Sequence, residues 1–288
     1  MSRIDEAVTN IRPASRVLRG QAASDGAGVR LTRIIGGPEL PQMDPFLLLD
    51  EFRSDSPGDY IGGFPDHPHR GFETVTYMLA GRMRHADNQG NAGLLEPGSV
   101  QWMTAGRGLI HSEMPEQENG LLWGFQLWVN LPASDKMTAP RYQDIGPAAI
   151  PQILLPGGAQ VRIIAGSIAG KTGPVSGIAT QPIYLDLHLP ANSTTVLPVA
   201  SELNAFAYLY EGSACIGEHD AARLVERGEL ALLGTGGTFR VQTRESPARL
   251  ILVAGRALHE PIARYGPFVM NTRTEILTAV EDFNAGRF

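Results

Sequence analysis

The sequence is poor in cysteine and in positive charge. Its only cysteine, Cys215, can form no internal disulfide, as is usual for a protein of a reducing compartment. The 24 Lys and Arg residues are outnumbered by 30 Asp and Glu, and they form no basic run. Nucleic acids and anionic membranes are recognised through clustered positive charge, so we expect direct binding to neither.

Long hydrophobic runs are also missing. No stretch approaches the roughly 20 apolar residues that cross a bilayer, and the first residues lack the apolar core of a signal peptide. Together with the lone cysteine, these absences predict a cytoplasmic protein.

Turn-forming residues are abundant, with 33 glycines and 21 prolines among 288 residues. Both interrupt helices, and they recur between short segments in which apolar and polar residues alternate. This pattern predicts an all-β fold, a sandwich or barrel. The expected strands are Phe72–Leu79, Ser99–Thr104, Leu122–Asn130, Ile183–Leu189, Ala205–Tyr210, Glu229–Leu233 and Arg249–Ala254.

Two halves of the chain resemble each other. Strand-like segments end at Gly81 and Gly212, and the next turns carry Gly98 and Gly228, so the spacings agree to within one residue. Leu131–Pro156, rich in Pro, Ala and Gly, is the expected linker. The sequence therefore predicts two tandem β-barrels, residues 1–132 and 133–288.

One short helix is expected at the C-terminus. Thr272 and Glu275 have the spacing of a capping box, in which each side chain satisfies a free backbone N–H of the first turn. Ile276, Leu277, Val280 and Phe283 then share one face. We expect this helix to pack on a barrel.

Three of the seven histidines fall in two short patterns, His67-Pro-His69 and His111-Ser-Glu113. Residues two apart on a strand point to the same face, so each pair projects its side chains together. On neighbouring strands the four side chains would converge, and three imidazoles with one carboxylate suit Fe, Mn, Ni, Cu or Zn. The equivalent positions of the second half hold no such residues, so the ligands should all precede Ile150.

Longer segments around these residues resemble the pirin family of the cupin superfamily. They are Asp66–Gly81, Pro97–Pro115, Asp44–Phe52 and Tyr265–Thr272. The resemblance spans nearly the whole chain and implies two tandem cupin barrels with a single iron, Fe(II), in the first. The family's ligands fall on His67, His69, His111 and Glu113, and the second barrel is implied to be a degenerate copy without metal ligands.

Glu73 is an alternative carboxylate ligand, because the general cupin pattern HxHxxxE places a glutamate there. Counting along an extended strand puts Glu73 on the same face as His67 and His69. The pirin pattern favours Glu113 as the ligand and gives Glu73 a supporting role. Either glutamate could be the catalytic base, with Glu113 preferred.

Other side chains near the motifs have two readings. His85 and Asp87 are expected to form a polar pair beside a turn rather than to support the metal ligands. Arg70 and Arg107 flank the ligands and could bind backbone carbonyls or an anionic substrate. The apolar side chains near the ligand strands are expected mainly in the core, with one or two lining a flat aromatic site: Phe64, Trp102, Met103, Phe125 and Trp128.

Several pirins resemble quercetinases, which open the central ring of a flavonol with dioxygen and release carbon monoxide. The resemblance thus implies a flavonol dioxygenase, with Glu113 able to take the hydroxyl proton. The alternative is a metal-dependent regulatory protein that binds a protein partner and whose oxygenase activity is incidental. A closed structural zinc site is a third interpretation.

Overall fold

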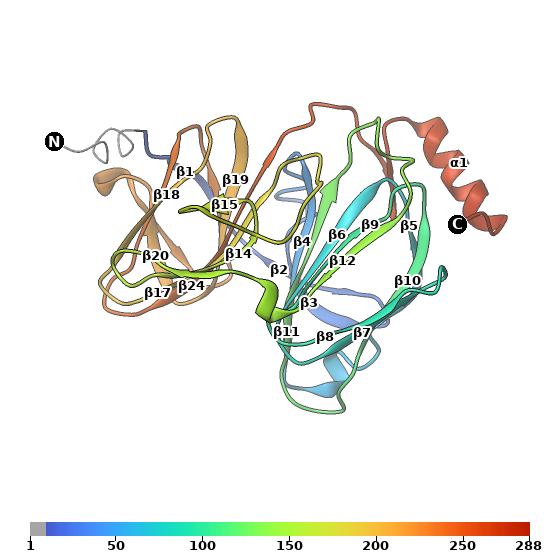
Figure 1. Ribbon diagram of the computed structural model, residues 1–288, viewed down its shortest axis with the longest axis horizontal. Coiled ribbons are helices and arrows are strands. Elements are labelled where there is room, and N and C mark those ends of the chain that lie inside the picture. Colours follow the sequence, from blue (N-terminus) through green and yellow to red (C-terminus); the bar gives the residue numbers. More distant parts are fainter. Residues whose placement is uncertain (1–9) are drawn as a thin grey trace. The chain divides into compact units, whose positions relative to one another are not determined.

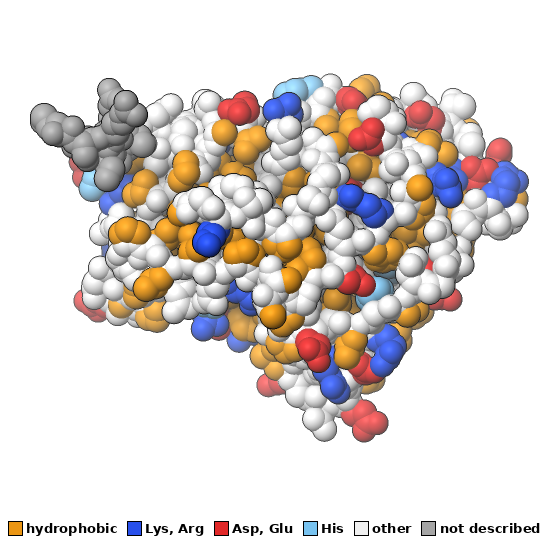
Figure 2. Space-filling model, viewed as in Figure 1, with side chains coloured by type: hydrophobic (Ala, Val, Ile, Leu, Met, Phe, Trp, Pro, Cys, Tyr) orange, Lys and Arg blue, Asp and Glu red, His pale blue; other side chains and the backbone are white. Residues whose placement is uncertain are grey.

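The structure is a computed structural model, and it describes residues 10–288. It divides into two compact units (Figure 1). The first barrel consists of Gln21–Pro147 and Leu258–Phe288, and the second consists of Ala148–Ala257 with Asn10–Gly20. No helix of the described residues is long and apolar enough to cross a membrane. Blue and red side chains are interspersed on the face drawn in Figure 2.

The first barrel has two antiparallel sheets. The larger has the order β12-β9-β6-β11-β4-β3-β2, and the smaller has the order β5-β10-β7-β8. The strands are β2 (Gln21–Asp25), β3 (Val29–Ile35), β4 (Phe46–Ser54), β5 (Phe64–His69), β6 (Phe72–Ala80), β7 (Met83–Asp87), β8 (Ala92–Leu95), β9 (Val100–Thr104), β10 (Leu109–Pro115), β11 (Leu122–Asn130) and β12 (Arg141–Ile145). Short 3-10 turns lie at Pro57–Asp59 and Pro147–Ala149.

The second barrel repeats this plan. Its larger sheet has the order β1-β22-β19-β24-β17-β14-β13, and its smaller sheet has the order β18-β23-β20-β21. The strands are β1 (Ala14–Arg19), β13 (Gln152–Leu154), β14 (Gln160–Ala165), β17 (Ile183–Leu189), β18 (Thr194–Pro198), β19 (Leu203–Glu211), β20 (Ser213–Ile216), β21 (Arg223–Glu226), β22 (Glu229–Leu233), β23 (Thr238–Gln242) and β24 (Ala248–Arg256). A small hairpin, β15 (Ser167–Ile168) and β16 (Lys171–Thr172), and a 3-10 turn at His219–Ala221 complete it.

Each end of the chain belongs to the barrel that the opposite half of the sequence mainly forms. Strand β1 pairs with β22 at the edge of the larger sheet of the second barrel; Figure 1 labels β1 beside β18 and β19 of that barrel. A hairpin of β25 (Ala263–Tyr265) and β26 (Phe268–Met270), followed by α1 (Arg273–Asn284), belongs to the first barrel. Each unit is thus built from two separate segments of the chain. The expected division into the continuous ranges 1–132 and 133–288 did not include this. Pairing between strands far apart in sequence leaves no trace in local composition.

Every expected strand is present with bounds within two residues of the prediction. Two cupin-like barrels with one short helix confirm the predicted fold class. The capping box at the start of α1 is formed, with the Thr272 hydroxyl accepting from the Glu275 N–H and the Glu275 carboxylate accepting from the Thr272 N–H. Ile276 and Ala279 are buried against Phe268 and Met270, so the helix packs on the hairpin.

A buried lysine fastens the hairpin to the first barrel. The Lys136 ammonium donates to the Gly71 carbonyl at 2.8 Å, the Val269 carbonyl at 2.9 Å and the Asn130 side chain at 2.8 Å. Burial lowers the Lys136 pKa to about 8. Gly71 has φ +87°, and a Cβ there would lie 2.0 Å from the Val269 carbonyl oxygen, so only glycine allows this approach.

Candidate metal centre and its pocket

Three histidines meet inside the first barrel. His67 and His69 lie on β5, and His111 lies directly opposite His67 on the neighbouring strand β10. The ring centroids are 4.4 Å apart for His67 and His111, 4.6 Å for His67 and His69, and 5.0 Å for His69 and His111. One nitrogen from each ring lies within 4.8 Å of those of the others, a spacing that one metal ion can bridge. In residues 10–288 this is the one such group of three or more potential ligands.

The electrostatics of this group fit a metal. His69 and His111 are fully buried, and neither ring nitrogen of either residue has a well-formed hydrogen bond. Burial and then the neighbouring histidines lower the pKa of both rings well below 6.5, although the nearby Pro267 carbonyl opposes this at His69. Both rings are therefore neutral near pH 7, the form that coordinates metals.

His67 differs from the other two rings. It is half-buried, and its Nδ1 lies 2.8 Å from the Pro65 carbonyl oxygen. A proton on Nδ1 would make that hydrogen bond and leave Nε2 free as a metal ligand. Each buried ring nitrogen of His69 and His111 that lacks a partner costs the folded state about 1–3 kcal/mol of free energy. A bound metal would give one nitrogen of each ring a partner and remove that part of the cost.

Glu113 lies in the same interior but is not part of the three-histidine group. It is buried, and its carboxylate accepts hydrogen bonds from Thr76 at 2.7 Å and from Gln126 at 3.3 Å. Thr76 lies on β6 and Gln126 on β11, so Glu113 reaches across the barrel to the larger sheet. Its place as a fourth ligand stays a prediction.

Glu73 is on the other face of β6, contrary to the expectation from counting. The ring centroids of Phe72 and His69 are 5.0 Å apart, and the Thr76 hydroxyl donates to Glu113. The even-numbered residues of β6 therefore face the histidines. Glu73 alternates away from it and accepts a hydrogen bond from Thr104 at 2.7 Å. Burial raises the Glu73 pKa to about 7. The counting failed because Gly71 turns the chain from one sheet into the other.

His85 and Asp87 are not a turn-side pair. His85 is buried on β7 opposite Glu113, and its Nε2 lies 3.0 Å from the Asp144 carboxylate on β12. Its ring stacks on Tyr142, with the centroids 5.6 Å apart. The partners of His85 come from β12, about 60 residues away along the chain, which is why local spacing did not reveal them.

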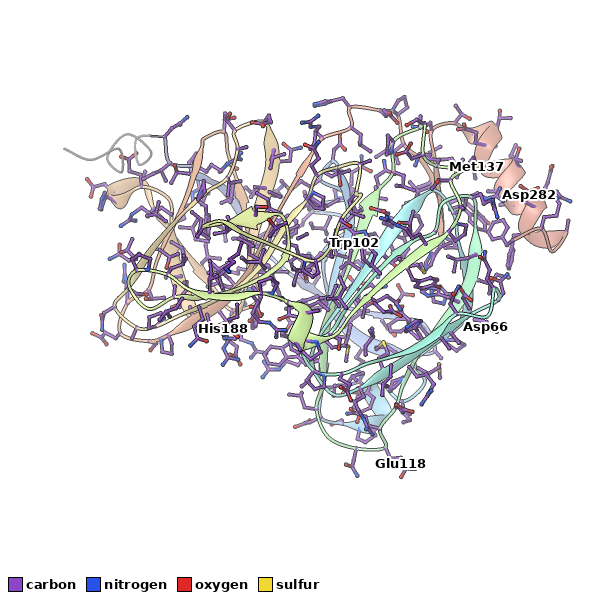
Figure 3. The ribbon with its side chains drawn as sticks, in the orientation of Figure 1. Asp66, Trp102, Glu118, Met137, His188 and Asp282 are labelled. Carbon is purple, nitrogen blue, oxygen red and sulfur yellow. The ribbon has the colours of Figure 1, made fainter. Side chains whose placement is uncertain are left out.

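Arg70 secures the end of β5 beside His69. Its guanidinium donates to the Arg107 carbonyl and pairs with Asp282 of α1 at 2.7 Å; Figure 3 labels Asp282 on the helix. It also lies 4.3 Å from the centre of the Phe288 ring. Of the two expectations for Arg70, binding to a backbone carbonyl is the one observed.

A pocket of about 500 Å³ is lined by His67, His69 and Glu113; His111 lies behind them, outside its lining. Its apolar wall comprises Leu31, Leu48, Phe52, Phe64 and Trp128, and Asp66 (labelled in Figure 3) lies on β5 at its edge. Phe64 and Trp128 thus line the site, whereas Trp102, Met103 and Phe125 are fully buried core residues. Sequence reasoning missed the contributions of Arg33, Asp50 and the β25–β26 hairpin.

In the pocket wall, the partly exposed Arg33 forms an ion pair with the buried Asp50. The Arg33 guanidinium binds both Asp50 oxygens, at 3.0 Å and 2.7 Å, and binds Asp25 at 2.8 Å. Burial raises the Asp50 pKa to about 6, against the opposing effect of Arg33. The positive charge of Arg33 is therefore balanced by the carboxylates of Asp50 and Asp25.

Two barrels with the same strand order, one with clustered histidines between β5 and β10, define a two-domain cupin. A model of the pirin family matches residues 28–129, and a model of the pirin C-terminal cupin domain matches residues 184–288. The chain belongs to the pirin family.

Three similar proteins illustrate this membership. A pirin-like protein of Caulobacter vibrioides is 50% identical over 279 residues, covering 96% of this chain and 99% of its own. A Pseudomonas aeruginosa protein named "Putative quercetin 2,3-dioxygenase" is 50% identical over 291 residues, covering 97% and 99%. The crystal structure of quercetin 2,3-dioxygenase from Acinetobacter baumannii superposes with a TM-score of 0.88 at 33% identity, covering 96% of this chain and 98% of that one.

Proposed function

We propose that this chain is a non-haem iron dioxygenase that opens flavonols such as quercetin with release of carbon monoxide. The observation that carries the proposal is the three-histidine group, two of whose members, His67 and His69, line a pocket with an apolar, partly aromatic wall. A volume of about 500 Å³ suits a ligand of flavonol size. The similarity to proteins named as quercetin dioxygenases supports the same activity.

In this proposal His67, His69, His111 and Glu113 hold one Fe(II). The iron would supply redox chemistry with dioxygen and an electrophilic centre for the deprotonated flavonol. The three imidazoles are the neutral donors. Glu113 would be the fourth, charged donor, with its carboxylate held by the hydrogen bonds from Thr76 and Gln126.

Glu113 is also the proposed base. A carboxylate beside the metal can accept the proton of the flavonol 3-hydroxyl, and Thr76 and Gln126 would fix its orientation. The apolar wall would keep the flat rings in place and limit the access of water to the reacting carbons. Glu73 has no part in this step, because it faces away from the pocket.

The remaining expectations belong to the same proposal. The substrates are a flavonol and dioxygen, the location is cytoplasmic, and the second barrel contributes no ligand. An alternative metal-dependent regulatory role, through a protein partner, would use the same iron without requiring flavonol turnover.

The decisive measurement is carbon monoxide release from quercetin and dioxygen by iron-loaded protein. Carbon monoxide distinguishes ring opening from oxidation of the flavonol by loose iron, which also bleaches its absorbance. The matched control is His69→Ala, which removes one imidazole and should abolish release while the barrel stays folded. Wild-type protein with stoichiometric iron that releases no more carbon monoxide than this variant would disprove the dioxygenase and favour the regulatory role.

A further inference from the structure

The β25–β26 hairpin supplies one wall of the pocket. Arg264, Gly266 and Pro267 line the cavity together with Trp128 of β11 and the histidines of β5. The hairpin is held against the end of β5 by the pairing of Phe268 with Arg70 and by the Lys136 contacts. Its position beside the site is therefore built into the fold of the first barrel.

Arg264 is the cation that this hairpin brings to the pocket. Its guanidinium carbon lies 4.9 Å from the centre of the Trp128 ring, and that ring lies 5.3 Å from the His69 ring. One aromatic side chain thus separates the guanidinium from a proposed metal ligand. This cation–π contact with Trp128 helps to hold the Arg264 guanidinium beside the pocket.

The hydrogen-bonding capacity of Arg264 is largely unused. Nη1 donates to the Leu47 carbonyl at 3.3 Å and Nε to the Gly266 carbonyl at 3.5 Å, both long contacts. Among residues 10–288 it makes no ion pair, and Nη2 donates to no protein atom. Arg33, the other arginine of the pocket, is saturated by Asp50 and Asp25. The two arginines therefore differ in what they can offer a ligand.

We infer that Arg264 selects aromatic substrates that carry an acidic oxygen, a phenolate or carboxylate, on the ring remote from the metal-chelating group. The planar fork matches such an oxygen, and the apolar wall takes the rings between the two ends. This inference rests on the proposed flavonol activity and adds the substrate class. Arg264 is exposed on one side, so the expected preference is modest, about five-fold.

The test measures binding without turnover. Protein loaded with Ni(II) is titrated under argon with 3-hydroxyflavone and with its carboxylates on either outer ring, with binding followed by calorimetry. Wild type should bind one carboxylated isomer about five-fold more tightly than the parent, and 0.5 M salt should reduce this preference. Arg264→Met should abolish the preference, measured in each protein as the ratio of its affinities for the carboxylated and parent compounds, and Arg264→Lys should keep part of it.

The control is Arg30→Met, since Arg30 is an exposed arginine of β3 outside the pocket that pairs with Asp59. It should leave the preference unchanged. A wild-type protein that favours the parent compound, or an Arg264→Met variant with an intact preference, overturns the inference. If Arg264→Met does not fold, Arg264→Lys and the salt dependence decide.

The carbon monoxide assay separates the two proposals. An Arg264-dependent preference without carbon monoxide release supports the substrate class and rejects the reaction. Release without any Arg264-dependent preference supports the reaction and rejects the role of Arg264.

Discussion

The two barrels share one strand order but fill their interiors differently. In the second barrel, β18 and β23 pair as β5 and β10 do in the first, and β20 takes the place of β7. The second interior holds Leu197, Phe239, Val241 and Ile216, members of one large apolar core. The first holds histidines and Glu113 on the matching strands.

This difference shows that the strand order does not depend on the polar site. An apolar interior gains free energy from burial, whereas buried imidazoles without partners cost free energy until a ligand satisfies them. The first barrel thus forgoes apolar burial at these positions, where the second barrel keeps it.

The largest expected effect tests the apolar interior. Phe239 lies on β23, between β18 and β20 in the smaller sheet, and its side chain is fully buried. Phe239→Ala should destabilise the second barrel by about 3–5 kcal/mol. Urea unfolding would measure the loss. Metal analysis of the folded variant should still give one ion per chain, because the proposed ligands lie in the first barrel. A loss of metal from the folded variant would contradict the independence of the site.

The next effect tests the contribution of the Glu113 carboxylate to metal affinity in the first barrel. Structural zinc sites with four ligands bind with roughly 10–16 kcal/mol, so one ligand carries about 2.5–4 kcal/mol. Glu113→Gln should therefore weaken metal binding by about 100- to 1,000-fold in a competition titration. Glu73→Gln is the matched control and should change affinity less than about three-fold. The reverse result would assign the carboxylate ligand to Glu73.

The third effect concerns Glu73, a titratable residue on β6 of the first barrel whose matching position in the second barrel holds an uncharged residue. Glu73 and Asn204 are the second residues of β6 and β19. The folded pKa of Glu73, about 7, exceeds its ordinary value of 4.5, so between these pH values the folded protein retains a proton that the unfolded chain releases. The stability due to this group therefore falls as the pH rises from 4.5 to 7 and stays low above 7.

Replacing Glu73 with glutamine removes this pH dependence. Relative to wild type, Glu73→Gln should gain up to about 3 kcal/mol of stability between pH 4.5 and pH 8. Urea unfolding of metal-free protein across that range provides the measurement. A difference between the two proteins that is the same at every pH would show that Glu73 titrates normally.

Local patterns predicted the parts of this molecule that local forces determine. The strands follow from alternating polarity and turn residues, and the start of α1 follows from its capping box. The histidine group was predictable because His67 with His69, and His111 with Glu113, each lie two apart on single strands. The family resemblance made β5 and β10 the expected neighbours.

Features that depend on distant pairing were not predictable in this way. The Glu73 prediction assumed one continuous strand, but Gly71 passes the chain to a different sheet. His85 is defined by Asp144 of β12, and Arg264 reaches the pocket from a segment beyond the second barrel. For His85 and Arg264 the partner is far along the chain, and no local spacing encodes it; for Glu73 the cause is a change of sheet at Gly71 that counting along one strand cannot show.

The exchange of chain ends has a consequence for folding during synthesis. Arg19 of β1 pairs with Glu229 of β22, and the pocket wall of the first barrel includes residues made after the whole second barrel. A ribosome has therefore produced the histidines long before it produces Arg264 and the Lys136-bound hairpin. The first barrel can complete its pocket only late in translation, so selective substrate binding is expected only after nearly the whole chain has emerged.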